Sequence, residues 1–215
     1  LEHIFMKSRT MIVAVAILAI TISSGWTFLK TTSTATSMTE AAGAFLGSLT
    51  AEQKEKAFFA KYEAPERVGW HFIPKAERKG LQMKEMTEPQ RKAAHALLRS
   101  TLSQVGYDKA TQIMQLEQIL HELEEAKGTR RFARDPQRYY FTIFGTPGPT
   151  ERWGLSIEGH HLSLNFVVAD GSVISSTPTF FATNPAIVMN QVKGGAKKGT
   201  RVLDEEETLG FEPVN

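Results

Sequence analysis

The sequence contains no cysteine. Disulfide bonds, thiolate metal sites and cysteine nucleophiles are therefore excluded, and any bound metal ion must be held by His, Asp, Glu or backbone oxygen atoms. The chain also has no strong charge of one sign, because 25 Lys and Arg residues are balanced by 23 Asp and Glu residues. This balance gives no indication of binding to nucleic acid or to an anionic membrane surface, and we predict no nucleic-acid partner.

Common catalytic signatures are missing as well. There is no G-x-S-x-G turn, no glycine-rich phosphate loop, no H-E-x-x-H pair and no G-x-G-x-x-G turn. What is present is an ordinary globular composition, with 41% hydrophobic and 22% charged residues. A chain of 215 residues, less a leader, is long enough for one well-buried core and predicts one domain.

The N-terminal residues have the pattern of an export signal. Lys7 and Arg9 form a positively charged region, and Met11–Ile22 is an apolar run shorter than the roughly 20 residues that span a bilayer. Ser33–Ala35 supplies small residues at the spacing typical of signal cleavage. We therefore predict an exported protein that works in the periplasm or outside the cell.

Residues 1–37 are predicted to be a signal peptide and linker, with Met6 as the natural start and an exposed linker at Thr31–Ser37. The last residues, Gly210–Asn215, contain no closing element, so a C-terminal truncation is expected. The alternative is that the leader stays uncleaved and anchors the chain in a membrane, which would be its one contact with a membrane. Trp26, Phe28 and Leu29 would then extend the apolar span.

Residues 38–215 are predicted to form a single α+β domain, in which N-terminal helices precede an antiparallel β-meander. Two capping-box patterns, Thr50–Gln53 and Thr87–Gln90, each open a helix. Together with the apolar periodicity they predict helices over Met38–Leu49, Thr50 to about Tyr62, Thr87 to about Gln104 with Gly106 as its stop, and Asp108 to Gly128.

Apolar residues recur every three or four positions in the last of these helices. They predict one buried stripe, formed by Ile113, Leu116, Leu120 and Leu123. The glutamates of the same helix are predicted to form a solvated face, which comprises Glu117, Glu122, Glu124 and Glu125.

The second half of the chain is rich in β-branched and aromatic residues. These predict strands over Tyr139–Phe144, Trp153–Glu158, His160–Ala169 and Ser172–Ser176. Asp170-Gly171 is a strong hairpin signal between the last two strands. A further helix is predicted to open at Asp204–Glu207, where acidic residues suit a helix N-terminus.

The most unusual polar segment is Glu158–His161. On a regular strand Glu158 and His160 share one face and His161 lies on the other, while Gly159 marks a bulge or a close backbone approach. A Glu and a His two positions apart can bind one divalent metal or form a carboxylate–imidazole acid–base pair. The alternative is that both histidines are structural and hydrogen-bonded to their neighbours.

A second segment, Trp70–Pro74, places His71 between two aromatic residues. An apolar setting favours the neutral, metal-ligating imidazole, and aromatic walls around one polar group are typical of a ligand pocket. Arg67 and Arg78 flank the segment and are suited to bidentate binding of a carboxylate or phosphate. The alternatives are an edge strand with an exposed His71, and two surface arginines in salt bridges.

These segments stand in order with others along the chain: Arg67 with Trp70–Pro74, Arg78 with Gly80-Leu81, Gln90-Arg91, Gly106-Tyr107, Leu116-Glu117, Asp135-Pro136, Trp153-Gly154, Glu158–Asn165, Thr177-Pro178 and Asn184–Ala186. In order and spacing, the set resembles the exported bacterial family called domain of unknown function 3500, from about Thr39 to Glu207. This chain has Phe72 where the family commonly has Tyr, and family members generally continue past its end. The resemblance implies no reaction, but it implies export and a site centred on the W-H-x-I-P and E-G-H-H segments.

The first functional hypothesis is a metal-dependent hydrolase. His71 and His160 would bind one divalent metal, Zn rather than Cu or Fe, and Glu158 or His161 would complete the site and act in catalysis. An open coordination position would hold the water that the metal acidifies. The acidic group of a small-molecule substrate would be bound by Arg67 or Arg78, with Asn165 orienting His161.

The second hypothesis is an extracytoplasmic protein that binds a small ligand or a metal without catalysis. Its histidines and Arg67 would donate hydrogen bonds that orient the ligand. The walls of the pocket would be apolar and formed by Trp70, Phe72, Trp153 and Phe180.

Overall fold

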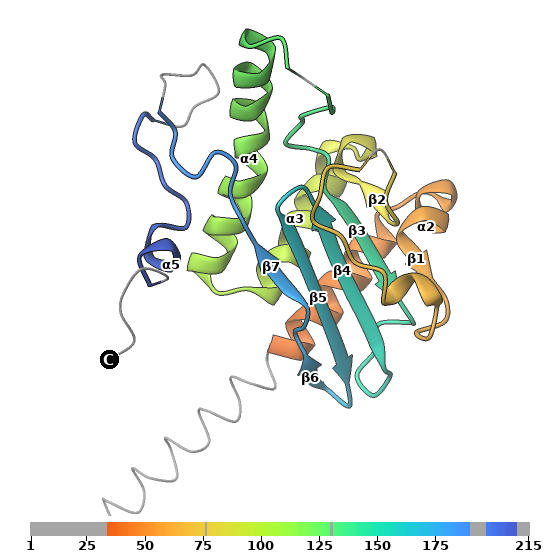
Figure 1. Ribbon diagram of the computed structural model, residues 1–215. Coiled ribbons are helices and arrows are strands. Elements are labelled where there is room, and N and C mark those ends of the chain that lie inside the picture. The colour runs from red at the N-terminus through yellow and green to blue at the C-terminus, as the bar shows by residue number, and fades with distance from the viewer. Residues whose placement is uncertain (1–33, 76, 130, 190–196, 210–215) are drawn as a thin grey trace, which may run out of the picture.

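The computed structural model describes residues 34–209, except positions 76, 130 and 190–196. Helices precede a mostly antiparallel sheet, so the predicted α+β class is confirmed (Figure 1). The elements in chain order are a helix over residues 34–47, α2 (Ala51–Ala57), β1 (Phe58–Phe59), the 3-10 turn η1 (Pro65–Arg67), β2 (Leu81–Gln82), η2 (Met83–Glu85), α3 (Glu88–Thr101), α4 (Gln104–Ala126), β3 (Tyr140–Phe144), β4 (Trp153–Gly159), β5 (Leu162–Ala169), β6 (Ser172–Ser175), β7 (Thr179–Phe181) and α5 (Asp204–Leu209).

Both predicted capping boxes form, and they are joined to each other. Thr50 caps α2 with Gln53 as its partner, and Thr87 caps α3 with Gln90 as its partner. Gln90 Nε2 also donates to Gln53 Oε1 at 2.7 Å, so the starts of the two helices are linked through their capping side chains. Local sequence patterns therefore set not only where these helices begin but also how they lie together.

The end of the second helix differs from the prediction. Helix α2 ends at Ala57, well before Tyr62, because Phe58 and Phe59 pair in parallel with Ile143 and Phe144 of β3. A long-range strand contact has overridden the local helical pattern.

The third and fourth helices meet at a different place from the one predicted. Helix α3 ends at Thr101, and Ser103 caps α4 by accepting a hydrogen bond from the Gly106 backbone N–H at 3.1 Å. Gly106 and Asp108, predicted as a helix stop and a helix cap, therefore lie inside the first turns of α4. Gly128, with a φ of 64°, follows the end of α4 as predicted.

The predicted linker is helical from residue 34 onward. Ala35 and Met38 of this helix are each 1% exposed and belong to the hydrophobic core. Cleavage directly after Ala35 would therefore remove the first described residues of a packed helix. Among the described residues, no helix is long and apolar enough to cross a bilayer.

The sheet is built on three central strands in the order β3-β4-β5, which pair antiparallel. Each outer edge of this trio is extended by two short strands, with β1 and β2 along β3 and β6 and β7 along β5. Because β1 runs parallel to β3, the sheet is mixed rather than a pure antiparallel meander. The predicted hairpin between β5 and β6 forms, with Asp170 and Gly171 at φ of 49° and 67°.

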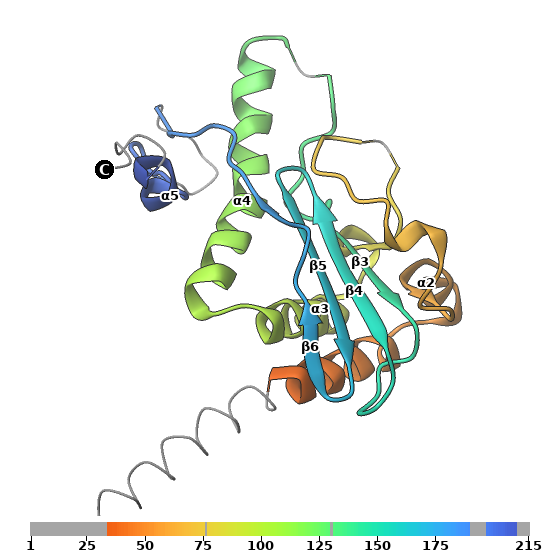
Figure 2. The same cartoon turned by 60° about the horizontal axis from the view of Figure 1, so that its bottom comes forward.

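One face of the sheet packs on the helices and holds the core. Phe141, Leu155, Ile157 and Leu164 are at most 2% exposed there, and the Phe141 ring lies 5.8 Å from that of Phe45 in the first helix. Figure 2 shows this first helix and α3 behind the strands.

The opposite face of the sheet is polar. Its cross-strand pairs include Tyr140 with Glu158, Ser156 with Asn165, and Glu158 with Ser163. The chain between β1 and β2 crosses in front of this face (Figure 1). We call the described residues of 60–80, all except position 76, the covering segment. Because it lies on the polar face, β3 and β4 are buried on both sides along their whole length.

Gly159 at the end of β4 is a point of close approach. A Cβ atom there would lie 2.2 Å from Tyr139 Cδ1, so the aromatic ring occupies the space of the missing side chain. The Tyr139 hydroxyl donates to the His160 backbone oxygen at 2.9 Å. The close backbone approach predicted at Gly159 is confirmed, and it fixes the tip of the β4–β5 hairpin.

We expect Gly159→Ala to lower the free energy of unfolding by about 1–3 kcal/mol, because the buried Tyr139 ring must move to admit a methyl group. The control is Gly43→Ala in the first helix, where no atom lies within 4 Å of an added Cβ. That change should raise the free energy of unfolding by about 0.5–1 kcal/mol. Urea titrations measure both values, and equal stability of the two variants would contradict the close packing at Gly159.

Candidate functional site

His160 and His161 lie in the two-residue turn between β4 and β5, not on a regular strand as predicted. The strand ends at Gly159, and His161 adopts a φ of 61°, which a turn requires and a strand does not. The two rings remain close, with centroids 4.0 Å apart. The geometry of the turn, rather than the alternation of side chains along a strand, therefore sets the directions of the two imidazole rings.

His160 is held by a carboxylate of helix α4. Its Nδ1 donates to Glu117 Oε1 at 2.5 Å, and both side chains are buried. Glu117 was predicted to be solvated, and this prediction is wrong. Glu117 follows Ile113 by four residues and precedes Leu120 by three, so it lies on the buried stripe of the helix.

Arg134 completes this buried cluster from the loop after α4. Its guanidinium makes a bidentate contact with Glu124, at 3.0 Å from Nε and 2.8 Å from NH2. Its NH1 lies 3.9 Å from Glu117 Oε2 and 3.2 Å from His160 Nδ1. Because Arg134 lies between two carboxylates of α4, the loop, the helix and the hairpin tip are joined by charge as well as by packing.

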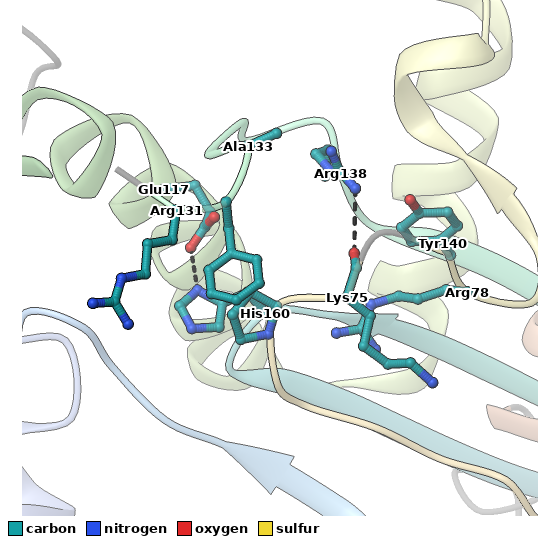
Figure 3. Close-up of a pocket in the computed structure, with 10 residues that line it drawn as sticks. Lys75, Arg78, Glu117, Arg131, Ala133, Arg138, Tyr140 and His160 are labelled. Atoms are coloured by element: carbon teal, nitrogen blue, oxygen red, sulfur yellow. Dashed lines mark hydrogen bonds and ion pairs between the residues drawn. The ribbon is translucent and has the colours of Figure 1, made fainter. Parts of the chain in front are cut away.

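A cavity of about 440 Å³ opens beside this cluster. Its lining is rich in cations and comprises Pro74, Lys75, Arg78, Glu117, Arg131, Phe132, Ala133, Arg138, Tyr140 and His160 (Figure 3). Four of these residues are Lys or Arg, whereas the only carboxylate is Glu117, which already binds His160. We call this space the basic cavity.

The cationic side chains of the basic cavity differ in whether they already bind other groups of the protein. Arg78 and Arg138 are partly used within the protein, because Arg78 NH1 donates to the His71 oxygen at 2.9 Å and Arg138 NH2 donates to the Lys75 oxygen at 3.2 Å. Lys75 and Arg131 are exposed, and within the described part of the chain neither side chain has a hydrogen bond or ion pair. These two side chains are the ones available to a ligand.

A neighbouring cavity of about 390 Å³ shares Arg131, Phe132, Ala133 and Arg138 with the first. It adds two further cations, Lys84 and Arg134, and one carboxylate, Asp135. Lys84 and Asp135 pair with each other at 2.7 Å. The segment around Phe132 thus lines two adjoining cavities that are both rich in cations.

Glu158 is buried, with an exposed fraction of 3%, but it is not the carboxylate that binds His160, which is Glu117. Its Oε1 accepts hydrogen bonds from Lys79 Nζ at 2.6 Å and Ser156 Oγ at 2.9 Å, and Arg78 NH1 lies 3.9 Å from its Oε2. The predicted catalytic carboxylate therefore binds cations of the covering segment. Burial lowers the pKa of Arg78, and the nearby Glu158 opposes that shift.

His71 is exposed, and its backbone oxygen, not its ring, makes the contact with Arg78. In residues 34–209, leaving aside the gaps at 76, 130 and 190–196, no three His, Cys, Asp or Glu side chains are grouped to hold a metal ion. His71 and His160 are therefore not grouped with Glu158 or His161 as the three ligands of one metal ion. The predicted zinc set has no geometric counterpart there.

The other predicted ligand-binding residues lie elsewhere on the polar face. Arg67, Trp70 and Asn165 line a separate cavity of about 240 Å³. Asn165 does not orient His161, since its amide donates instead to the Pro178 oxygen at 2.9 Å and to Ser163 Oγ at 3.2 Å. Arg78, in the basic cavity, is the one member of the predicted ligand-binding set that lies near His160.

Comparison with known proteins gave a match to one family model. The family model described as "Protein of unknown function (DUF3500)" matches residues 31–215. The chain belongs to this family. The match confirms the resemblance and begins earlier than Thr39, so it includes the first helix. Comparison with curated proteins gave no match, and comparison with solved structures gave none either.

The sequence did not point to Arg131 and Arg138, which line the basic cavity, or to Arg134, which lies beside His160. These arginines follow one another at spacings of three and four in the loop before β3, where no periodic pattern draws attention to them. A signal for Glu117 did exist, because a helical projection places it between Ile113 and Leu120. It was overridden by the general rule that glutamates are solvated.

His161 is half-buried, and its Nδ1 is buried without a hydrogen-bond partner in the described structure. Burial lowers its pKa to about 4, aided by the neighbouring His160 and Arg134 and opposed by a hydrogen bond to the Thr183 backbone. The ring is therefore neutral at the pH of most compartments.

This lowered pKa predicts a pH-dependent stability. Between about pH 6.5 and pH 4 the unfolded chain protonates His161 while the folded chain does not, so stability falls as the pH falls through this window. We expect His161→Asn, which tolerates a positive φ, to remove about 1–2 kcal/mol of that loss, since the ring is only half-buried. Urea titrations at a series of pH values measure it. His71→Asn, at an exposed histidine, is the control, and an equal effect of both variants would contradict the assignment.

Proposed function

We propose that this protein binds a small anionic ligand in the basic cavity, and that it does so outside the cytoplasm. The observation that supports binding is the excess of cations. Lys75, Arg78, Arg131 and Arg138 line one cavity, and its only carboxylate is occupied by His160. The support for export is the leader pattern of Lys7, Arg9 and Met11–Ile22.

The ligand class follows from the donors. Lys75 and Arg131 are exposed lining residues that offer charged groups without a partner among the described residues, and the buried Arg78 supplies fixed positive charge. Guanidinium groups suit the planar oxygen pairs of carboxylates and phosphates, and a second cation favours a ligand with more than one negative charge. Inorganic phosphate and citrate are simple probes with that chemistry.

The test removes the two free cations. We expect the double variant Lys75→Gln/Arg131→Gln to bind phosphate and citrate about tenfold or more weakly than the parent protein at low ionic strength, as measured by isothermal titration calorimetry. The control is Lys54→Gln/Lys92→Gln, which removes the same charge from exposed positions on α2 and α3. Equal weakening in both double variants would mean a general charge effect and would contradict a site in the basic cavity.

Hydrolysis is a second candidate function, favoured by the Glu117–His160 pair at the wall of the cavity. With Nδ1 bound to Glu117, the Nε2 of His160 is the nitrogen left to act as a general base. It would take a proton from a water molecule whose oxygen bonds to the acyl carbon of an anionic ester. The same proton would then pass to the leaving oxygen as the ester bond breaks, which leaves His160 as it began.

We expect Glu117→Gln to lower kcat for 4-nitrophenyl hemisuccinate by about tenfold to a hundredfold with little change in KM, because the imidazole loses the carboxylate that orients it. Glu125→Gln, on the exposed side of the same helix, should leave both constants unchanged. Absorbance of released nitrophenol measures the rate. If the parent protein binds citrate but does not hydrolyse the ester, the hydrolase candidate is wrong and the binding function stands.

A further inference from the structure

A second cavity on the polar face of the sheet shares no lining residue with the basic cavity. It measures about 240 Å³, and its floor is the cross-strand pair Ser156 and Asn165. Trp70, Pro178 and Arg67 are among the other residues that line it. We call it the aromatic cavity.

Trp70, which lines the aromatic cavity, is held in place by packing against other aromatic rings. The Trp70 ring lies 5.9 Å from that of Phe72 and 6.3 Å from that of Phe180, and the latter two are 4.2 Å apart. Trp153, which the sequence predicted for the same pocket, lies instead in the core on the opposite face of the sheet, fully buried. Of the four aromatic residues predicted to form the pocket, only Trp70 lines the cavity, and Phe72 and Phe180 pack against it.

The polar groups of the floor already satisfy each other. Asn165 Oδ1 lies 3.0 Å from Ser156 Oγ, and the Asn165 amide donates to the Pro178 oxygen and to Ser163. The floor is thus rigid and offers little hydrogen-bonding capacity to a ligand.

Arg67 is different, because it is fixed but not used up. Its Nε donates to the Tyr62 oxygen at 3.0 Å, and its guanidinium lies 4.3 Å from the centre of the Tyr62 ring. Among the described residues, no hydrogen bond or ion pair reaches its two terminal nitrogens. A positioned guanidinium with two free terminal NH2 groups in a cavity lined by Trp70 is suited to one carboxylate.

From this arrangement we infer that the aromatic cavity is a second ligand site, which takes a small aromatic monocarboxylate. The ring of the ligand packs between Trp70 and Pro178, and its carboxylate binds the terminal nitrogens of Arg67. The volume lies below the roughly 300–1,000 Å³ of pockets for drug-sized ligands, so the body of the ligand is limited to about one ring. The inference stands apart from the proposed function, because it involves different residues and a different ligand class.

The first test needs no variant. Phenylacetate and 2-phenylethanol have the same ring and nearly the same size, but only phenylacetate has a carboxylate. We expect the full chain to bind phenylacetate at least about tenfold more tightly than 2-phenylethanol by isothermal titration calorimetry. Equal affinity for the two probes, or no binding of phenylacetate, would overturn the inference.

The second test assigns the site. Arg67→Gln should weaken phenylacetate binding about tenfold and leave 2-phenylethanol unchanged, whereas Trp70→Ala should weaken both. Lys75→Gln/Arg131→Gln, in the basic cavity, should leave phenylacetate binding at the parent value. If that double variant weakens phenylacetate binding and Arg67→Gln does not, the carboxylate is bound in the basic cavity and the inference is wrong. Thermal unfolding verifies that each variant is folded.

Discussion

The basic cavity and the aromatic cavity both depend on the buried ion pair between Lys79 and Glu158, because the covering segment lines both cavities. Glu158 lies on the polar face of the sheet, and Lys79 binds it at 2.6 Å. Lys79 also donates to the Gly69 oxygen, and Arg78 donates to the backbone oxygens of His71 and Ile73. A buried carboxylate without partners would be strongly unfavourable, so Glu158 requires these two cations, and their other contacts fix the segment that carries them.

The covering segment owes little to regular structure. Between β1 and β2 it contains only the short 3-10 turn η1, so its backbone hydrogen-bonding groups need other partners. The arginine and lysine side chains provide several of these, and the sheet provides one more, since the His161 N–H donates to the Phe72 oxygen at 2.8 Å. The result is a strap with different chemistry at its two ends. Arg67 and Trp70 face the aromatic cavity, while Lys75 and Arg78 face the basic one.

The sequence predicted local features well where a local pattern decides them. The capping boxes at Thr50 and Thr87 and the hairpin at Asp170-Gly171 are examples, because their hydrogen bonds and φ angles involve residues only a few positions apart. The prediction failed where distant residues decide. Phe58 leaves the helical pattern because Ile143 pairs with it, and Glu117, whose place on the buried stripe of α4 is a local feature, meets partners in His160 and Arg134 that arrive from elsewhere in the chain. No spacing within α4 could show those partners.

The two histidine segments illustrate why convergence alone does not define chemistry. The sequence suggested that Trp70–Pro74 and Glu158–His161 meet, and they do meet. They meet through main-chain atoms and cations, with the Phe72 oxygen on the His161 N–H and with Arg78 beside Glu158, while the His71 ring is exposed. His160 turns the other way and finds its carboxylate on α4. Glu158, next to two cations, anchors the covering segment, whereas His160, held by Glu117, lines the basic cavity. The same four-residue segment therefore supplies both the anchor of the covering segment and part of the lining of the basic cavity.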